Sequence, residues 1–179
     1  LASCATLVHN VEGTLLAKRD TDPDALVSKG FTQFPDEPLP VTLNSTAWRR
    51  AEITSASGHG NPRAVARIYG AVARGGSLDG VTLMSPRTIE DMLVEQHNQF
   101  ERMQQRPYHQ GRGILLNTPV SVWMGPNMRA FGHHGFGGSI GFGDPDAKIG
   151  FSYACNKMHA VGDNGPRARR IIEALYEVL

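Results

Sequence analysis

Two adjacent histidines stand in a glycine-rich run whose residue types could do chemistry. Residues 131–142 read FGHHGFGGSIGF, which places His133 and His134 among five glycines and one serine. Glycine at this density indicates tight bends, or backbone that another group approaches closely. Titratable side chains beside such backbone predict a functional site in this run.

The same run contains a serine pattern that we do not interpret as a nucleophile. Residues 137–141 match G-x-S-x-G, the nucleophile elbow, which requires a helix directly after its serine. Residues 142–145 read FGDP instead, and they predict a turn into another strand. We therefore interpret Ser139 as a turn or strand residue.

The paired histidines do not predict a metal centre. Adjacent strand residues point to opposite faces, so His133 and His134 are not expected to share one ion. No carboxylate or cysteine follows at a ligand spacing. The sequence predicts no metal and no cofactor, and on residue patterns alone the pair is interpreted as one core and one exposed histidine.

The other histidines carry less information. His59 lies between two glycines before a predicted helix, where it either lines a cleft or braces its own loop, and we favour the brace. The remaining histidines have no context and are interpreted as surface residues, namely His9, His97, His109 and His159.

Several helices are needed to position the run. Asn61-Pro62 opens a helix that ends at Gly75, because Val65, Ile68, Tyr69 and Val72 share one apolar face. Two short helices are predicted, one from Pro23 to Gly30 with Asp22 as its cap and one over residues 44–50. A third begins at Pro86, with Ile89, Met92 and Leu93 inward. The last begins at about Pro166 and has one apolar side, made of Ala168, Ile171, Ile172, Leu175 and Leu179.

Strands follow in the second half of the chain. They are predicted over residues 113–117, 120–124, 129–135, 139–142 and 149–155. Short turns between them require antiparallel neighbours. With helices flanking a sheet of about five strands and the last helix on the sheet, the fold class is α+β. Residues 31–43 and 97–110 are predicted as loops, residues 81–84 as a linker or edge strand after an Asp79-Gly80 turn, and residues 1–16 as a short helix or a strand pair.

Composition excludes some partners. The 179 residues are 40% hydrophobic and 20% charged with a formal charge of +1, so nucleic acid is not an expected partner. No apolar run is long enough to cross a bilayer. Cys4 and Cys155 are predicted to be free thiols, which favours a reducing, cytoplasmic location. The chain opens on Leu1 without a signal peptide, and we expect it to be a piece of a longer protein.

Residues 131–139 resemble the third signature of the serine β-lactamase and penicillin-binding-protein superfamily. In particular, the chain is similar to the family VIII carboxylesterases, the β-lactamase-related esterases in which Lys-Thr-Gly becomes His-x-Gly. The resemblance spans roughly residues 44–179. It is also carried by residues 57–67, 80–86, 127–130, 141–145 and 153–158.

This resemblance implies an incomplete β-lactamase-like fold and a serine hydrolase that acts through an acyl-enzyme. His133 would stand at the position of the family's cation or hydrogen-bond donor, and the Phe136 N–H would be one oxyanion-hole donor. Gly135 would let substrate lie close to the strand. His59, in a stretch that also resembles the family, is a further candidate for substrate binding. Asn164 and Arg167 resemble an Asn-x-x-Arg that holds a substrate carboxylate.

The chain departs from the family in lacking a nucleophile. No serine is followed three residues later by lysine, and no Tyr-x-Asn occurs. We therefore expect residues 1–179 to be the C-terminal portion of a single domain whose N-terminal part carries these motifs, and we expect this portion alone to be inactive.

Three functions remain open. The first is an esterase, favoured because histidine lacks the fixed charge that lysine offers a β-lactam carboxylate. The second is a non-catalytic binding or scaffold protein, and the third is a D-Ala-D-Ala peptidase or β-lactamase. The expected partners are an ester or lactam substrate and the missing N-terminal part, without nucleic acid or membrane.

Overall fold

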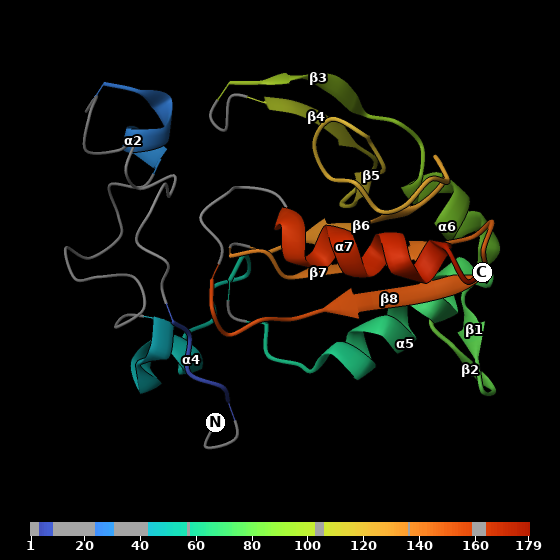
Figure 1. Ribbon diagram of the computed structural model, residues 1–179, viewed down its shortest axis with the longest axis horizontal. Helices are drawn as coiled ribbons and strands as arrows, with labels where there is room; N and C mark the ends of the chain where they lie inside the picture. Colours follow the sequence, from blue (N-terminus) through green and yellow to red (C-terminus); the bar gives the residue numbers. More distant parts are fainter. Residues whose placement is uncertain are drawn as a thin grey trace.

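A six-stranded antiparallel sheet forms the centre of the molecule (Figure 1). The computed structural model describes residues 4–8, 24–30, 43–56, 58–102, 106–135, 137–158 and 164–179. Consecutive strands are neighbours, in the order β3 (His97–Glu101), β4 (Arg106–Gln110), β5 (Leu115–Leu116), β6 (Phe131–His134), β7 (Ile140–Asp144) and β8 (Ile149–Tyr153). The α+β class and the antiparallel sheet predicted from the sequence are confirmed.

Glycines on β7 and β8 form the sheet face on which α5 (Pro62–Ala73) packs. A Cβ on Gly141 would lie 2.7 Å from the Tyr69 ring, and one on Gly143 would lie 2.8 Å from the Tyr69 carbonyl oxygen. A Cβ on Gly150 would overlap the backbone of Ala66 and Gly70. The helix therefore sits closer to the sheet than any strand side chain would permit.

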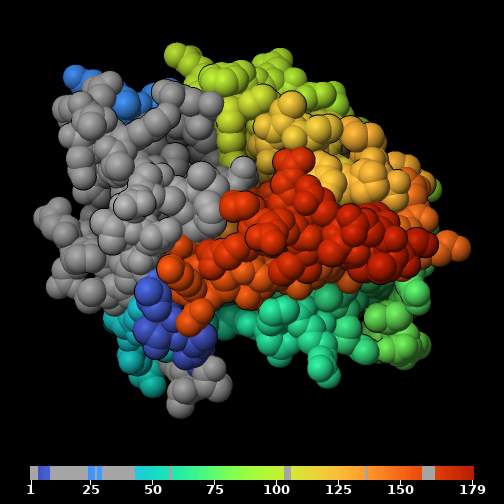
Figure 2. Space-filling model, viewed as in Figure 1, coloured from blue at the N-terminus to red at the C-terminus, as the bar shows by residue number. Residues whose placement is uncertain are grey.

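The opposite face of the sheet carries α7 (Gly165–Tyr176), which Figure 2 shows lying across the front of the molecule. Because strand side chains alternate, Phe142 points to this face between the two glycines of β7. Here it joins a core made of Leu115, Val122, Met124, Ala130, Ile140, Ala168 and Ile172.

A second hydrophobic cluster lies under α5 and α6 (Pro86–Met92) and contains Val72, Ile89, Ile114, Leu116 and Phe131. Both helices begin where the sequence predicts, because a side chain caps each one. The Asn61 side-chain oxygen Oδ1 accepts from the Ala64 N–H at 2.9 Å, and the Ser85 hydroxyl accepts from the Thr88 N–H at 3.1 Å.

A short hairpin lies against α5. β1 (Ser77–Leu78) and β2 (Val81–Thr82) form a hairpin around Asp79 and Gly80, whose φ angles of 51° and 78° suit a two-residue turn. The edge-strand interpretation of this segment is therefore confirmed. Two further helices are α2 (Leu26–Gly30) and α4 (Thr46–Arg50), the latter capped by Ser45.

The prediction of a loop over residues 97–110 is wrong, because β3 and β4 pair there as a hairpin. These strands read HNQFE and RPYHQ and show no apolar alternation. β3 is an edge strand with one neighbour, so its side chains can be polar on both faces.

The predicted strand over residues 120–124 is also wrong. Instead of pairing with the sheet, this segment folds back on itself, with the Thr118 N–H donating to the Val122 carbonyl at 3.3 Å. The buried Asn117 side chain bonds to the backbone of Gly125, Asn127 and Met124 and holds the segment in this loop form.

Three residues predicted to face inward are exposed. Ile68 on α5 is 55% exposed, and Ile171 on α7 is 45% exposed beside the fully buried Ile172. Leu179 lies beyond α7 and is also exposed. No helix within the described ranges has the length and apolar character needed to cross a membrane. The expectations for residues 9–23 and 31–42 lie outside the described residues.

Candidate active site

The glycine-rich run lies at one end of the sheet, on the left in Figure 1, where β6 ends and β7 begins. We call this the motif end. His133 and Gly135 are exposed there, and His134 is half-buried. Both α5 and α7 also begin at the motif end, so their N-terminal residues lie near the run (Figure 1).

The two histidine rings lie together instead of on opposite faces. Their centroids are 5.5 Å apart with 25° between the planes. The His133 Nδ1 lies 2.5 Å from the His134 carbonyl oxygen. The expectation of opposite faces fails because β6 ends at His134, where strict strand alternation stops.

Arg106 on β4 holds His134 from the neighbouring part of the sheet. Its Nη2 lies 2.8 Å from the His134 Nε2. Arginine can only donate, so this ring nitrogen accepts and the His134 proton resides on Nδ1. The guanidinium also lies 5.6 Å from the centroid of the Tyr108 ring, whose pKa burial raises. Sequence reasoning missed Arg106 because it interpreted residues 97–110 as a loop.

The turn after the histidines is held by backbone and side-chain bonds. The Gly135 N–H donates to the Ser139 carbonyl at 2.6 Å. The Cys155 N–H donates to the Ser139 hydroxyl at 3.4 Å, and the Cys155 thiol donates to the Gly137 carbonyl at 3.3 Å. Ser139 is therefore a turn residue that leads directly into β7, as predicted. Phe136, the predicted oxyanion-hole donor, lies outside the described residues.

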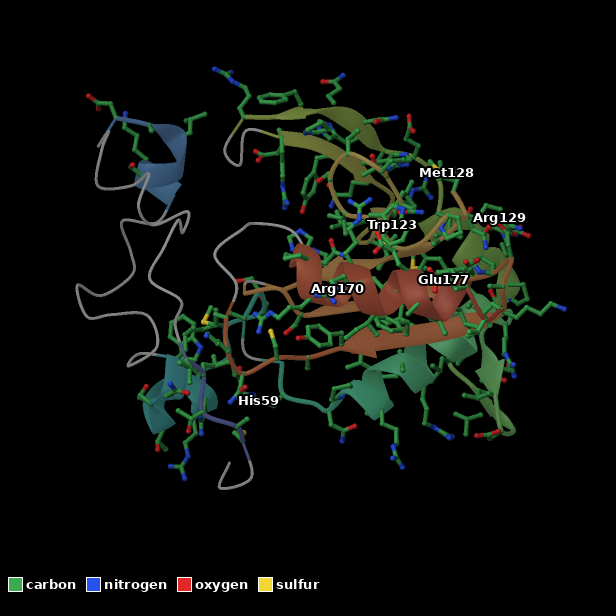
Figure 3. The ribbon with its side chains drawn as sticks, in the orientation of Figure 1. His59, Trp123, Met128, Arg129, Arg170 and Glu177 are labelled. Carbon is green, nitrogen blue, oxygen red and sulfur yellow. The ribbon has the colours of Figure 1, made fainter. Side chains whose placement is uncertain are left out.

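The other predicted site residues are spread around the motif end. His59 is exposed in the loop that enters α5, and Figure 3 shows it at this end of the molecule. The buried Asn164 donates to the Trp123 carbonyl at 2.9 Å, and Arg167 donates to the Lys157 carbonyl at 2.5 Å. The latter two side chains thus tie α7 to neighbouring loops, and their contact with substrate stays a prediction.

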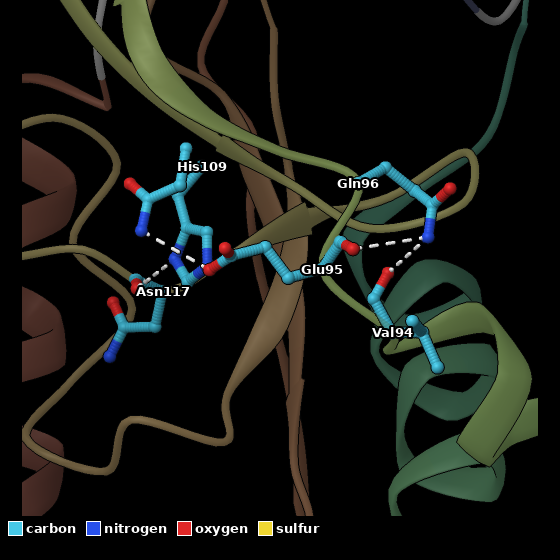
Figure 4. A network of polar contacts seen from close by, with 6 residues as sticks. Val94, Glu95, Gln96, His109 and Asn117 are labelled. Atoms are coloured by element: carbon cyan, nitrogen blue, oxygen red, sulfur yellow. Dashed lines mark hydrogen bonds and ion pairs between the residues drawn. The ribbon is translucent and has the colours of Figure 1, made fainter.

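His109 is not the plain surface residue that the sequence suggested. Its side chain is 18% exposed, with Nε2 2.8 Å from the Glu95 carboxylate and Nδ1 3.2 Å from the Asn117 carbonyl (Figure 4). The network ties the β3–β4 hairpin to the loop after β5. No group of three metal-ligating side chains occurs among the residues that the structure describes.

With this fold and motif end, the chain belongs to the β-lactamase family, whose model matches residues 16–176. It is 34% identical over 115 residues to the esterase/β-lactamase LipL of Mycobacterium tuberculosis, an alignment that covers 60% of this chain and 24% of LipL. The resemblance to this family drawn from the sequence is confirmed.

Solved structures agree with this assignment. A family VIII carboxylesterase is 40% identical with a TM-score of 0.74, over 78% of this chain and 37% of that one. A penicillin-binding-protein homologue from Caulobacter crescentus is 35% identical with a TM-score of 0.72, over 83% and 43% of the two chains. The chain thus spans about a quarter of its curated relative and less than half of these structures.

Proposed function

We propose that this chain is the C-terminal portion, over residues 1–179, of a single β-lactamase-like domain that hydrolyses small-molecule esters through a serine acyl-enzyme. The observation that carries the proposal is the His133-His134-Gly135 run at the end of β6, where His133 and Gly135 are exposed. It occupies the position of the family's Lys-Thr-Gly signature on the central sheet. The relatives named esterase and carboxylesterase support the same chemistry.

In this proposal the nucleophile comes from outside the 179 residues. A Ser-x-x-Lys serine attacks the ester carbonyl, the alcohol leaves, and water later releases the acid. The Phe136 N–H and the N–H of the nucleophile stabilise the developing oxyanion. Gly135 supports such a role, since among the described residues a Cβ there would meet only Ser139, at 3.7 Å.

The first test is intact-mass analysis with a fluorophosphonate serine probe. The 179-residue chain and the full polypeptide encoded by its gene are treated in parallel. We expect one probe adduct on the full polypeptide, at a Ser-x-x-Lys serine, and none on the shorter chain. A full polypeptide that contains no such serine and takes up no probe would replace the enzyme proposal with the second candidate, a non-catalytic binding or scaffold protein.

The choice between ester and lactam is tested on the full polypeptide that has not been treated with the probe. The absence of lysine from the motif favours esters, whereas the similarity to a penicillin-binding-protein homologue keeps a peptidase or β-lactamase as the competing activity. We expect hydrolysis of p-nitrophenyl acetate or butyrate to exceed that of a chromogenic cephalosporin. Faster turnover of the cephalosporin would contradict the ester assignment.

A further inference from the structure

We infer that Ser139 and Cys155 are positioning residues, which together hold the turn between β6 and β7 in the shape that presents the Phe136 N–H to the developing oxyanion. This inference rests on the proposed function and deepens it, because it gives the serine of the G-x-S-x-G pattern a role other than nucleophile. It is carried by the hydrogen bonds that join this turn to the segment after β8.

The backbone of the turn is rich in glycine and needs support from outside. Gly137 and Gly138 have φ angles of 96° and 100°, which favour glycine. The Gly135 N–H donates to the Ser139 carbonyl at 2.6 Å, and the Gly138 N–H donates to the Gly135 carbonyl at 3.2 Å. A Cβ on Gly137 would lie 3.0 Å from the side chain of the buried Met158, which therefore covers the turn. Because glycine backbone has many alternative conformations, contacts from a neighbouring segment select among them.

Cys155 makes such contacts through both its backbone and its thiol, from the segment of residues 155–158, which we call the post-β8 segment. Its N–H donates to the Ser139 hydroxyl at 3.4 Å, and its thiol donates to the Gly137 carbonyl at 3.3 Å. A carbonyl oxygen can only accept, so the thiol proton is directed to Gly137. The Ser139 Oγ lies 3.9 Å from the same sulfur, so the hydroxyl is the donor in that contact. The two side chains thus connect both ends of the 137–139 stretch.

The post-β8 segment is itself anchored by two other parts of the chain. The Val8 N–H donates to the Asn156 carbonyl, and the Met158 N–H donates to the Val8 carbonyl, each at 2.7 Å. Arg167 on α7 donates to the Lys157 carbonyl at 2.5 Å. The support for the turn is therefore fixed in place on the body of the molecule.

The position of the turn matters because an oxyanion-hole donor has to lie about 2.7–3.1 Å from the developing charge. Complete loss of one such donor lowers kcat by about 100- to 1000-fold, and a displaced donor keeps part of its effect. The interaction strengthens as the oxyanion forms, so a loosened turn should slow acylation without removing the active site.

The test uses the full polypeptide, with p-nitrophenyl acetate as substrate and exhaustive fluorophosphonate labelling to count active sites. We expect Cys155→Ala to lower kcat/KM per labelled site by about tenfold while one probe per chain is still taken up. Cys155→Ser keeps a donor at the same place and should stay within about twofold of the original rate. Ser139→Ala should lose rate as Cys155→Ala does, and it should still take up one probe.

An inhibitor that forms a tetrahedral adduct separates a positioning role from a merely structural one. A trifluoromethyl ketone bonds to the nucleophilic serine oxygen and places its own oxyanion in the hole, so its affinity for Cys155→Ala should fall by the same factor as kcat/KM. Cys4→Ala replaces the other cysteine of the chain and is the matched control, with unchanged values.

Fewer labelled sites with an unchanged rate per site in Cys155→Ala would show a purely structural role and overturn the inference. An equal loss of rate in Cys4→Ala, or unchanged affinity of Cys155→Ala for the ketone, would also overturn it. If the unsubstituted polypeptide neither takes up the probe nor hydrolyses the ester, the proposed function fails, and this inference fails with it.

Discussion

In the loop after β5, the Asn117 side chain makes hydrogen bonds to backbone groups that a strand would pair with a neighbouring strand. Its amide donates to the carbonyls of Gly125 and Asn127 at 2.8 and 2.9 Å, and its oxygen accepts from the Met124 N–H at 2.8 Å. The bonds to Gly125 and Met124 are buried, and the bond to Asn127 is partly buried. Replacing this amide by a carboxylate keeps its shape and removes both donors.

We expect Asn117→Asp to lower the free energy of unfolding by about 3 kcal/mol, because a carboxylate oxygen would face two carbonyl oxygens in a buried site. Urea denaturation at pH 7 measures the loss. The exposed Asn156→Asp is the matched control and should change stability by less than about 0.5 kcal/mol. Equal midpoints for the two variants would show that the Asn117 bonds are not important for the loop.

Glycine substitutions test the close approach of α5 to the sheet. A Cβ on Gly150 would overlap the Ala66 carbonyl oxygen and the Gly70 amide nitrogen, which are backbone atoms that cannot rotate away. We expect Gly150→Ala to destabilise the chain by about 1–3 kcal/mol through this overpacking. In Gly58→Ala the new methyl group has no atom within 4 Å, so this variant should be neutral. Urea denaturation at pH 7 compares the two variants.

At the scale of an element, α7 offers two adjacent isoleucines in opposite environments. Ile172 is fully buried against the sheet and Ile171 is 45% exposed. We expect Ile172→Ala to cost about 2–5 kcal/mol in unfolding free energy, whereas Ile171→Ala should cost less than about 1 kcal/mol. Similar losses for both variants would mean that α7 sits in a different rotation on the sheet.

Tyr176, the last residue of α7, is expected to make the folded state less stable in alkali. Burial, followed by the hydrogen bond to Asp144, raises the pKa of Tyr176. The folded state therefore keeps the phenol proton where the unfolded chain releases it, so stability is fully present below a pH of about 10 and falls as pH rises above it. We expect Tyr176→Phe to show a shallower fall in the urea midpoint between pH 9 and 11.

Burial also raises the pKa values of Tyr69 and Tyr108, so part of the alkaline fall should remain in the Tyr176→Phe variant. The comparison of slopes, not the absolute midpoint, isolates Tyr176. An identical slope in the variant and the original chain would contradict a role for the Tyr176–Asp144 bond in this pH dependence.

These elements also show where sequence reasoning succeeds. Residues 139–142 predict a strand, although β7 runs on to Asp144 where a turn was expected, and α5 has both a cap at Asn61 and an apolar face. The β3–β4 hairpin was missed because its polar residues lie at a sheet edge and carry no period-2 signal. Residues 120–124 have that signal, yet a buried amide seven residues from Met124 overrides it. Such long-range polar bonds leave no local pattern.

The candidate site follows the same division. The glycine-rich run locates His133 and Gly135, because residue types and spacing are local features. The contact of Arg106 with His134 depends on the register of three strands, from β4 to β6 across β5, and so could not be predicted once the hairpin was missed. Similarly, the stacking of the two histidine rings depends on where β6 ends.

At the scale of the whole molecule, the first described residues are joined to the segment that follows the last strand. Val8 bridges to Lys157 in parallel, with its N–H donating to the Asn156 carbonyl at 2.7 Å and its carbonyl accepting from the Met158 N–H at 2.7 Å. The Asn44 side chain makes two hydrogen bonds to the backbone of Leu7, the residue before Val8. It accepts from the Leu7 N–H at 2.8 Å and donates to the Leu7 carbonyl at 2.9 Å.

We therefore expect Asn44→Ala to release residues 4–8 from the motif end while β7 and β8 stay intact. One side chain satisfies both backbone groups of Leu7, so its loss removes the main tether before the Val8 bridge. Hydrogen exchange read by mass spectrometry should show faster exchange in peptides covering residues 4–8 and 156–158. Peptides covering 140–153 should be unchanged.

The control is Asn98→Ala. The Asn98 amide lies on β3, far in the sequence from residues 4–8, and donates to the Glu95 carboxylate at 3.1 Å. This variant should leave exchange at residues 4–8 unaltered. Uniformly faster exchange throughout the sheet in Asn44→Ala would mean that the N-terminal segment and the sheet open as one cooperative unit. The Asn44 contact would then stabilise the whole fold, and not only the attachment of residues 4–8 to residues 156–158.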